Sequence, residues 1–359
     1  MSAMLELDDV KMSFALRDGR RLQAVKGVSL KVPAGATLGL VGESGCGKST
    51  LARCIVGLHK PDGGSITFDG RRLTQLDRRS LKSIRRQLTM VFQDPYASLN
   101  PRRTVAEIVG APLEIHDLYS GAERRDRILQ ILERVGLSAS HARRYPHEFS
   151  GGQRQRIGLA RALVTEPKLV VLDEPVSALD VSIQAQILNL LMDLQSELEL
   201  TLVLIAHDLG VVRHISQEIA VMYLGRIVEQ TNTDELFAGP RHHYTAGLLA
   251  SVPNPDPHSR DDGSQLIRGD IAVTSAQAGG CDFYPRCPAV TEHCRSAVPE
   301  LSELSRGHLT ACHLPIDRST VDRGSAGSDL AATDLAAVHP VIADGAAMGG
   351  SAGEQPASS

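Results

Sequence analysis

The 359-residue sequence contains no tryptophan, and aromatic residues make up only 3% of it. Proteins that bind single-stranded nucleic acid commonly stack the bases on aromatic side chains, so this class of function has little support. No stretch approaches the roughly 20 consecutive apolar residues that a membrane-spanning helix requires. Residues 1–10 carry acids where a secretory signal has a basic segment and an apolar run. These absences predict a chain that works in the cytoplasm and has no membrane span of its own.

A strong basic charge is also missing, because the formal net charge is −4. Residues 321–359 alone carry a net charge of −4, which leaves residues 1–320 balanced. Because residues 1–320 carry equal positive and negative charge, the sequence argues against a dedicated surface for binding nucleic acid. The segment beyond residue 320 is rich in Ala, Gly, Ser and Asp and poor in large apolar residues, which is typical of a disordered tail.

Short apolar runs alternate with amphipathic segments through residues 1–250, and this pattern predicts an α/β fold. The runs that we expect to be strands are residues 37–41, 65–69, 88–92, 168–173 and 201–206. An Arg-rich stretch of helical character, about residues 95–166, interrupts this core. The predicted organisation is a domain at 1–250, a Pro-rich linker at 251–279, a Cys-rich extension at 280–316 and an acidic tail at 317–359.

A phosphate-binding motif follows the first of these predicted strands. Residues 42–50, GESGCGKST, satisfy the pattern G-x-x-x-x-G-K-[ST] between a strand and a helix. Glycines allow the backbone N–H groups to surround a polyphosphate, and the positive end of the helix dipole adds to the attraction. Lys48 is expected to reach the β- and γ-phosphates, and the hydroxyl of Ser49 to ligate Mg²⁺.

An acidic pair and a second anion site complete the pattern. The run VVLDEP, 170–175, predicts a buried strand that presents Asp173 to Mg²⁺, followed by Glu174, which would activate water. Residues 150–153, SGGQ, open a helical run with a Ser N-cap and two glycines, which leaves free N–H groups for an anion. Two anion sites far apart in one chain suggest a sandwich of two subunits, each completing the nucleotide site of the other.

In this ordered set of motifs the sequence resembles the ATP-binding cassette (ABC) family over about residues 4–250. The resemblance implies a P-loop NTPase core with an antiparallel β subdomain and a helical subdomain, which hydrolyses ATP with Mg²⁺. It also implies catalytic roles for Glu174, His207 and Gln93, with Gln93 contacting the metal as well. The nucleotide-binding residues that it implies are Phe14 (on adenine), Gly42, Ser44, Gly45, Gly47, Lys48, Ser49, Thr50, Ser150, Gly151, Gly152, Gln153 and Asp180.

The segment beyond residue 240 narrows this resemblance. The stretch at 240–257 and the motifs RCP (286–288), PEL (299–301) and HLTACH (308–313) look like the C-terminal part of the ATPase subunits of oligopeptide, dipeptide and nickel importers. This resemblance implies peptide import at the cytoplasmic face of the cell membrane. The implied partners are two membrane permease subunits, which would dock near Gln93 and residues 96–101, a second ATPase subunit, commonly a different chain, and an extracytoplasmic solute-binding protein.

Four of the six cysteines lie in this last segment, whereas Cys46 and Cys54 are expected to be packing residues. Disulfides do not persist in a reducing cytoplasm, which favours a metal. The spacing C-x5-C-x6-C-x17-C fits neither the usual zinc pairs nor the ferredoxin runs. Some members of the resembled family hold a four-iron four-sulfur cluster on such cysteines, and zinc with His293, His308 or His313 as substitute ligands is the alternative. The cysteines that would hold either metal are Cys281, Cys287, Cys294 and Cys312.

Other functions stay open at this point. Soluble ABC-type ATPases act in DNA repair and translation, although these usually carry two cassettes or a long coiled-coil insertion. The same importer class also carries nickel or other small solutes. An iron–sulfur redox sensor with a secondary ATPase is a further alternative, which metal-dependent ATPase activity would distinguish.

Overall fold

The computed structural model describes residues 3–94, 98–177, 179–251 and 279–317. The chain divides into two compact units, Met1–Arg318 and Ser319–Ser359, and every described residue belongs to the first. Nearly all of the predicted linker and of the predicted acidic tail lies outside the described residues. In the described part of the chain, no helix is both long enough and apolar enough to span a bilayer.

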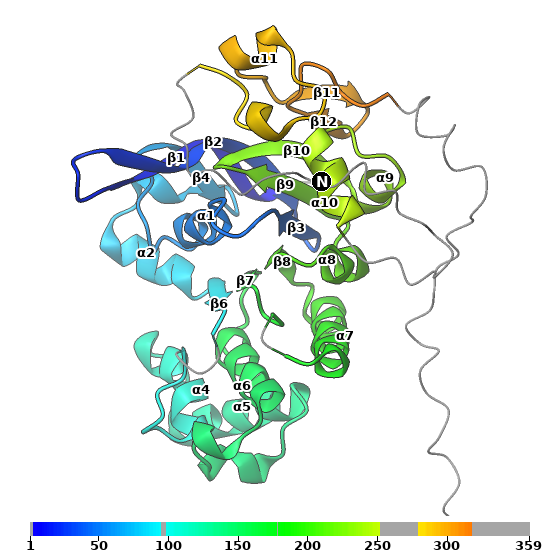
Figure 1. Cartoon of the computed structure of the whole chain (residues 1–359). Coiled ribbons are helices and arrows are strands. Elements are labelled where there is room, and N and C mark those ends of the chain that lie inside the picture. Colours follow the sequence, from blue (N-terminus) through cyan, green and yellow to red (C-terminus); the bar gives the residue numbers. More distant parts are fainter. Residues whose placement is uncertain (1–2, 95–97, 178, 252–278, 318–359) are drawn as a thin grey trace, which may run out of the picture. The chain divides into compact units, whose positions relative to one another are not determined.

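The main feature of the first unit is an eight-stranded sheet in the order β11-β12-β10-β9-β3-β8-β7-β6 (Figure 1). Strands β9, β3, β8, β7 and β6 are parallel, whereas β10, β12 and β11 continue the sheet in antiparallel pairings. The strands are β3 (Thr37–Val41), β6 (Leu88–Val91), β7 (Leu169–Asp173), β8 (Thr201–Ala206), β9 (Glu218–Tyr223), β10 (Arg226–Asn232), β11 (Ser302–Ser305) and β12 (His308–Thr310).

The central strands have the composition that a doubly covered sheet requires. Every residue of β3, β7 and β8 is buried, as expected where helices cover both faces of a parallel sheet. Their sequences therefore show continuous apolar runs in place of alternation, and this is why the sequence predicted their positions to within one residue. The expected strands at 37–41 and 201–206 are confirmed with the same bounds.

A separate four-stranded antiparallel sheet, in the order β2-β1-β4-β5, forms the expected β subdomain. Its strands are β1 (Ala3–Ala15), β2 (Arg21–Pro33), β4 (Gly63–Phe68) and β5 (Arg71–Arg72). Its apolar side chains, such as Leu5, Val28 and Phe68, form one hydrophobic cluster with those of β3 and the first helix. The phosphate-binding loop thus begins where the two sheets share a core.

The helices divide between those on the main sheet and those of the helical region. The helices are α1 (Lys48–Ile55), α2 (Arg78–Arg85), α4 (Val105–Ile115), α5 (Gly121–Arg134), α6 (Gly151–Leu163), α7 (Val181–Leu198), α8 (Leu209–Ile215), α9 (Thr233–Ala238), α10 (His243–Ala250) and α11 (Glu292–Ser296), with short 3-10 turns at Leu73–Gln75, Ala139–Arg143, Pro146–Glu148 and Tyr284–Arg286. Helices α4, α5 and α6 pack on one another (Figure 1), within the stretch that was expected to be helical.

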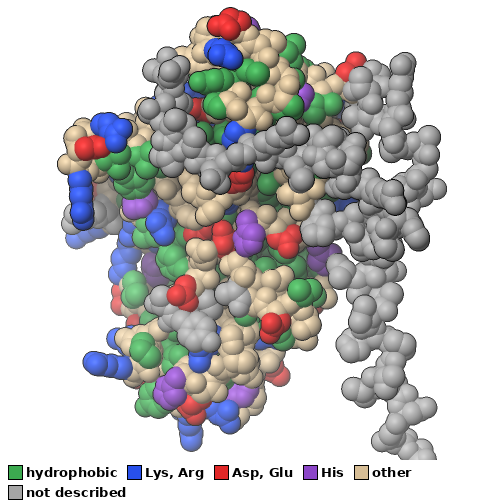
Figure 2. Space-filling model, viewed as in Figure 1, with side chains coloured by type: hydrophobic (Ala, Val, Ile, Leu, Met, Phe, Trp, Pro, Cys, Tyr) green, Lys and Arg blue, Asp and Glu red, His purple; other side chains and the backbone are tan. Residues whose placement is uncertain are grey.

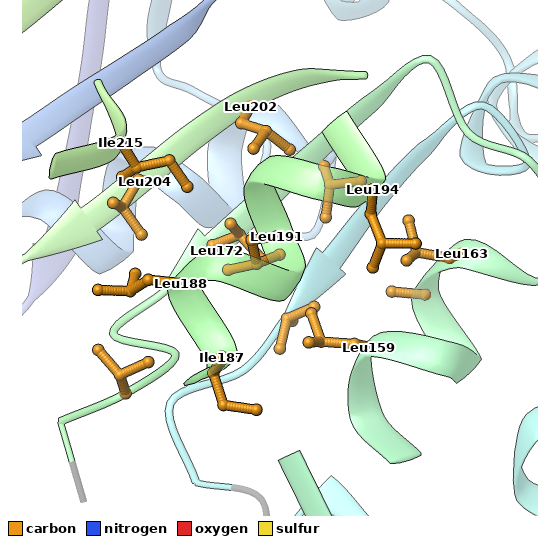
Figure 3. Packing of buried hydrophobic residues seen from close by; sticks show 14 of the residues in the cluster. Leu159, Leu163, Leu172, Ile187, Leu188, Leu191, Leu194, Leu202, Leu204 and Ile215 are labelled. Carbon is orange, nitrogen blue, oxygen red and sulfur yellow. The ribbon is translucent and has the colours of Figure 1, made fainter. Parts of the chain in front are cut away.

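Helix α7 shows how the core is built. Its buried residues Ile187, Leu188, Leu191 and Leu194 recur at the spacing of one helix face. In Figure 3 these side chains meet leucines of β7 and β8 on one side and of α6 on the other. Because α6 and α7 share this cluster, the packing sets the position of the N-terminus of α6 relative to the sheet.

The Cys-rich extension joins the main sheet. Strand β12 pairs antiparallel with β10, so that Thr310 lies opposite Glu229, and β11 pairs in turn with β12 (Figure 1). Phe283 is 2% exposed and contacts the rings of Tyr223 and Tyr244 in the main core. Backbone pairing and an aromatic anchor therefore attach this segment to the rest of the unit.

Candidate nucleotide site

The phosphate-binding loop runs from the end of β3 to the start of α1. At two of its positions the backbone conformation requires glycine. Gly42 and Gly47 have φ values of 149° and 108°, a region that residues with a Cβ rarely adopt. A Cβ on Gly42 would lie 2.1 Å from the carbonyl oxygen of Met222, and one on Gly47 would lie 2.1 Å from that of Ala24. The inner side of the loop is therefore packed tightly against the neighbouring backbone, whereas Ser44 and Gly45 are exposed at its tip.

Lys48 is the first residue of α1 and is 4% exposed. Its ammonium group donates to the carbonyl oxygens of Gly42 (2.6 Å) and Glu43 (2.9 Å). These bonds hold a buried cation inside the loop where a polyphosphate would lie. Thr50 follows two residues later, half-buried on the same helix.

Ser49 and Asp173 meet beside the loop. The Ser49 hydroxyl donates to Oδ1 of Asp173 at 2.9 Å. Asp173 ends β7 and is 2% exposed, and this burial raises the pKa of its carboxyl, an effect that the Ser49 hydrogen bond opposes. A hydroxyl and a carboxylate side by side are oxygen ligands of the kind that Mg²⁺ prefers, so the residues present fit a magnesium site.

Glu174 follows in a strained conformation, with a φ of 47°. Such left-handed non-glycine residues cluster at functional sites. Its Oε2 accepts a hydrogen bond from Nε2 of Gln93 at 2.7 Å and lies 3.6 Å from Nδ1 of His207. The structure thus brings together three residues, from the ends of β6, β7 and β8, that the sequence predicted as catalytic.

The second predicted anion site lies at the N-terminus of α6. Ser150 is the N-cap: its Oγ accepts from the backbone N–H of Gln153 (3.4 Å), and Oε1 of Gln153 accepts from the backbone N–H of Ser150 (3.1 Å). A Cβ on Gly151 would lie 3.3 Å from Leu179, and one on Gly152 would lie 2.6 Å from Ile183. This glycine pair therefore also permits close packing of α6 against the start of α7.

Two further predicted residues lie apart from this centre. Asp180 is exposed at the N-cap of α7 and makes no side-chain capping bond. Within the part of the chain that the structure describes, no hydrogen bond or ion pair joins Asp180 or residues 150–153 to the loop at 42–50. Phe14 is half-buried on β1, with its ring edge-on to His59 at 5.6 Å between centres.

The four clustered cysteines line one small cavity of about 10 Å³, together with His243 and His313. That volume holds about one water molecule and is too small for a metal cluster. Among the described residues, no group of three or more His, Cys, Asp or Glu side chains has an arrangement that could hold a metal ion. The expected iron–sulfur or zinc site is therefore not supported as the side chains are arranged.

The histidines that were named as substitute ligands make other contacts. His308 is fully buried, with Nε2 2.7 Å from Oε1 of Glu229. His313 contacts the carbonyl oxygen of Ala297 at 3.0 Å, and its ring lies 4.3 Å from that of His293. Burial of Cys46 and Cys54, at 3% and 1% exposed, agrees with their expected packing role.

One group of contacts at the loop was missed by the sequence analysis. Arg286, in the extension, makes two hydrogen bonds to the carboxylate of Glu43 in the phosphate-binding loop, at 2.8 and 2.9 Å. The two residues are 243 positions apart. No local pattern could have indicated this pairing.

The charged surface of the protein is mixed. On the face that Figure 2 shows, Lys and Arg side chains are interspersed with Asp and Glu side chains and with apolar groups. A groove of about 680 Å³ runs beside Gln93 and Asp173 and includes Arg53, Leu58 and Phe92. Leu58 is 52% exposed and Phe92 37% exposed, so this groove presents apolar side chains to solvent next to the candidate site.

Comparison with protein families gives two matches. Residues 25–177 match the family described as "ABC transporter". Residues 228–294 match the family described as "Oligopeptide/dipeptide transporter, C-terminal region". The second match includes three of the four clustered cysteines.

Individual proteins agree with these matches. The oligopeptide transport ATP-binding protein AppF of Bacillus subtilis is 49% identical over 323 residues, covering 87% of this chain and 97% of that protein. The oligopeptide transport ATP-binding protein OppF of Escherichia coli is 47% identical over 319 residues, covering 86% and 95%.

Solved structures resemble the core. A dimeric post-hydrolysis state of the ATP-binding cassette MJ0796, bound to ADP and Pi, is 33% identical with a TM-score of 0.59, covering 64% of this chain and 99% of that chain. The structure of cbiO1 from Clostridium perfringens, part of the ABC transporter complex cbiONQ, is 31% identical with a TM-score of 0.59 and covers 66% and 92%.

Proposed function

The chain belongs to the ABC transporter family, with the ATP-binding proteins of oligopeptide transport, and on that basis we propose that it hydrolyses ATP to energise peptide import through separate permease subunits. The observation that carries this proposal is the convergence of Ser49, Asp173, Glu174 and Gln93 beside the phosphate-binding loop. Metal ligands and a candidate base lie together there, as hydrolysis of a phosphoanhydride requires.

Lys48, Ser49 and Asp173 would hold the nucleotide and its metal. Mg²⁺-ATP, when bound, supplies the phosphoanhydride that is cleaved. The Lys48 ammonium already points into the loop, where it would neutralise charge on the β- and γ-phosphates. The Ser49 hydroxyl and the Asp173 carboxylate, 2.9 Å apart, would complete the metal's coordination from the protein side.

Glu174 would act as the general base. Its carboxylate would accept the proton of the attacking water, since it lies at the carboxyl end of β7 next to the metal residue. The Gln93 amide, 2.7 Å away, would orient both the carboxylate and the water. His207, 3.6 Å from the same carboxylate, would face the γ-phosphate.

A second ATPase subunit would complete the site. Residues 150–153 and Asp180 make no polar contact with the loop of their own chain among the described residues, and the N-terminus of α6 carries free N–H groups suited to an anion. In a head-to-tail sandwich these residues would reach the nucleotide of the partner. A different, homologous chain or a second copy would both satisfy this geometry.

The permease subunits would dock in the groove beside Gln93. The exposed apolar side chains of Leu58 and Phe92 suit a short amphipathic helix of a membrane protein, as in helix-in-groove recognition. Part of the predicted docking segment, residues 96–97, lies outside the described residues. Docking there would keep the chain at the cytoplasmic face of the membrane, with the solute-binding protein on the opposite side.

A metal in the extension remains a subordinate proposal. It is supported by the convergence of Cys281, Cys287, Cys294 and Cys312 on one cavity, and it requires these side chains to rearrange. Protein purified without oxygen would be assayed for iron, acid-labile sulfide and zinc. Equal iron and sulfide indicate a cluster, one zinc per chain indicates the alternative, and four free thiols without metal contradict both.

The ATPase proposal is tested by Mg²⁺-dependent phosphate release from the assembled complex, with Lys48→Ala as the inactive reference. We expect hydrolysis that depends on Mg²⁺ and is lost with Lys48→Ala. Hydrolysis that survives this substitution would place the active site elsewhere.

A further inference from the structure

One arginine of the extension, Arg286, contacts the phosphate-binding loop. Both terminal nitrogens of Arg286 bind the two carboxylate oxygens of Glu43, at 2.8 and 2.9 Å. The side chain of Arg286 is 9% exposed and that of Glu43 22% exposed. This bidentate geometry is the strongest arrangement that an arginine and a carboxylate form, and the Glu43 carboxylate holds the pKa of the Arg286 guanidinium above its usual range.

The backbone of Glu43 is held from the same side. Its N–H donates to the hydroxyl of Tyr244 at 2.8 Å, and Tyr244, on α10, is fully buried. The ring of Tyr244 packs against Tyr223 and against Phe283 of the extension. Side chain and backbone of this one loop residue therefore both depend on the C-terminal part of the fold.

Glu43 in turn positions the lysine that would bind phosphate. The ammonium group of Lys48 donates to the carbonyl oxygen of Glu43 at 2.9 Å. A chain of polar contacts thus runs from Arg286 through Glu43 to the ammonium group of Lys48. Movement of Glu43 would displace a main-chain oxygen that holds that cation in place.

We propose that Arg286 is a positioning residue for the nucleotide: by fixing Glu43, the C-terminal extension sets the geometry of the phosphate-binding loop and hence its affinity for ATP. This inference rests on the proposed binding of ATP at residues 42–50. It makes the extension part of the nucleotide site, although Arg286 and Glu43 are 243 positions apart.

Another ion pair offers a matched control. Asp282, four residues before Arg286, binds Lys26 at 2.9 Å and Arg226 at 3.2 Å. The Asp282 side chain is 8% exposed and that of Lys26 16% exposed, which is comparable with the Arg286–Glu43 pair, whereas Arg226 is 39% exposed. These two ion pairs also join the extension to the core. Both partners of Asp282 lie outside the phosphate-binding loop, so loss of these pairs loosens the attachment of the extension without freeing Glu43.

The experiment measures the equilibrium affinity of the full-length chain for Mg²⁺ and a fluorescent ATP analogue. The variants are Arg286→Gln, Glu43→Gln, the two combined, and Asp282→Asn. We expect each change in the Arg286–Glu43 pair to weaken binding about fivefold or more, as is typical of coupled sites. The double variant should bind no more weakly than the weaker single variant, because both remove the same interaction, whereas Asp282→Asn should bind as the unmodified chain does.

A conservative variant separates positioning from folding. Arg286→Lys keeps the charge but loses the two-point geometry, so its affinity should lie between those of the unmodified chain and Arg286→Gln. Circular dichroism and thermal unfolding establish that each variant is folded, and if Arg286→Gln does not fold, Arg286→Lys carries the test.

Three results would overturn the inference. The first is an unchanged affinity for the ATP analogue in the folded Arg286 variants, and the second is a double variant in which the affinity losses of Arg286→Gln and Glu43→Gln multiply. The third is a loss of affinity in Asp282→Asn as large as that in Arg286→Gln. Lys48→Ala is measured alongside. If that variant bound ATP normally, the proposed ATP site itself would be wrong, which is a different outcome from failure of the Arg286 inference.

Discussion

Single side chains decide the chemistry of the nucleotide site. Asp173 and Glu174 are neighbours in the sequence but differ in environment, because Asp173 is buried against Ser49 whereas Glu174 is only half-buried and faces Gln93 and His207. The left-handed φ of Glu174 turns its side chain away from the path of the strand. This difference fits the proposed roles, in which one acid holds a metal and the next activates water.

Replacement of Glu174 by Gln should preserve ATP binding and lower hydrolysis about 100-fold or more, which is the usual contribution of a general base. The amide keeps the shape and the hydrogen bond to Gln93 but cannot accept a proton. Two nucleotides should then stay trapped in a closed pair of subunits. Phosphate release and retained nucleotide are measured on the same complex.

Glu199→Gln is the matched control, because Glu199 is also an acid with positive φ, at 51°, and is exposed at the C-cap of α7. Its hydrolysis rate should not change. Near-normal hydrolysis by the Glu174 variant would remove this residue from the catalytic role.

His242 makes stability depend on pH. Burial lowers its pKa from the ordinary 6.5 to about 4, against an opposing effect of the neighbouring Glu229. Between these two pH values the unfolded chain binds more protons than the folded chain, so the free energy of unfolding falls as the pH drops from about 6.5 to about 4. The loss from this one group is on the order of 3 kcal/mol.

His242→Asn tests this dependence. Its side-chain oxygen can still accept the backbone N–H of Tyr244 that Nδ1 accepts now, but it does not titrate. The free energy of unfolding, measured with urea at pH 7 and at pH 4.5, should differ less between the two pH values in the variant than in the unmodified chain. An undiminished difference would contradict the account, and His147→Asn at an exposed position serves as the reference.

The part of the site that we propose a partner subunit completes lies at the N-terminus of α6. Helices α5 and α6 begin in the same way, with a Ser N-cap followed by Gly121 in one and Gly151 in the other, and each has a capping box. Local sequence therefore determines where both helices start. The difference lies in their positions: a Cβ on Gly151 would lie 3.3 Å from Leu179, just before α7, whereas among the described residues no atom lies within 4 Å of a Cβ placed on Gly121.

Gly151→Asp should leave ATP binding by the single chain intact and reduce hydrolysis by the assembled pair about tenfold or more. A carboxylate there would repel the γ-phosphate held by the partner and occupy the helix-end N–H groups. A tenfold loss corresponds to only about 1.4 kcal/mol. Gly121→Asp, at the equivalent position of α5, is the control and should retain full activity; equal losses in both would exclude the sandwich arrangement.

The sequence predicted some strands and loops more accurately than others. The strands at 37–41 and 201–206 were found with the same bounds because continuous apolar runs signal buried parallel strands locally. Asp173 was located from the apolar run that precedes it, whereas the phosphate-binding loop was located from its glycine and lysine motif at residues 42–50. Strand β12, only His308–Thr310, was not predicted, since so short an edge strand is defined by its pairing with β10 and not by its own residues.

The extension shows the limit of composition as a guide. Its four clustered cysteines, in a chain expected to work in a reducing cytoplasm, suggested a metal site. The structure instead adds it to an existing sheet and buries Phe283 in the main core. The Arg286–Glu43 pair has no local signal at all, because a contact between residues so distant in sequence leaves no periodicity.

The whole protein requires partners for its function. The groove beside Gln93 opens next to Asp173, the proposed metal ligand, so an occupant of the groove would lie close to the proposed catalytic centre. With a permease docked in this groove, coupling between transport and hydrolysis would have a short physical path. The exposed apolar side chains of Leu58 and Phe92 would supply the contacts at the proposed docking site.

Leu58→Glu should therefore abolish co-purification with the permease subunits while leaving ATP binding unchanged. The substitution places a charge at a groove position that is 52% exposed and apolar, where burial under a partner would be costly. Leu22→Glu, 45% exposed on β2, is the control. If both variants assembled normally, the permeases would bind elsewhere.

Peptide uptake by membrane vesicles tests the central claim most directly. Vesicles would contain the permease subunits with this chain and its partner ATPase, together with the solute-binding protein and a labelled peptide. We predict peptide accumulation that requires ATP and that disappears when Glu174→Gln replaces the unmodified chain. Accumulation at the same rate with the variant, or ATP hydrolysis without accumulation of any peptide tested, would contradict the account.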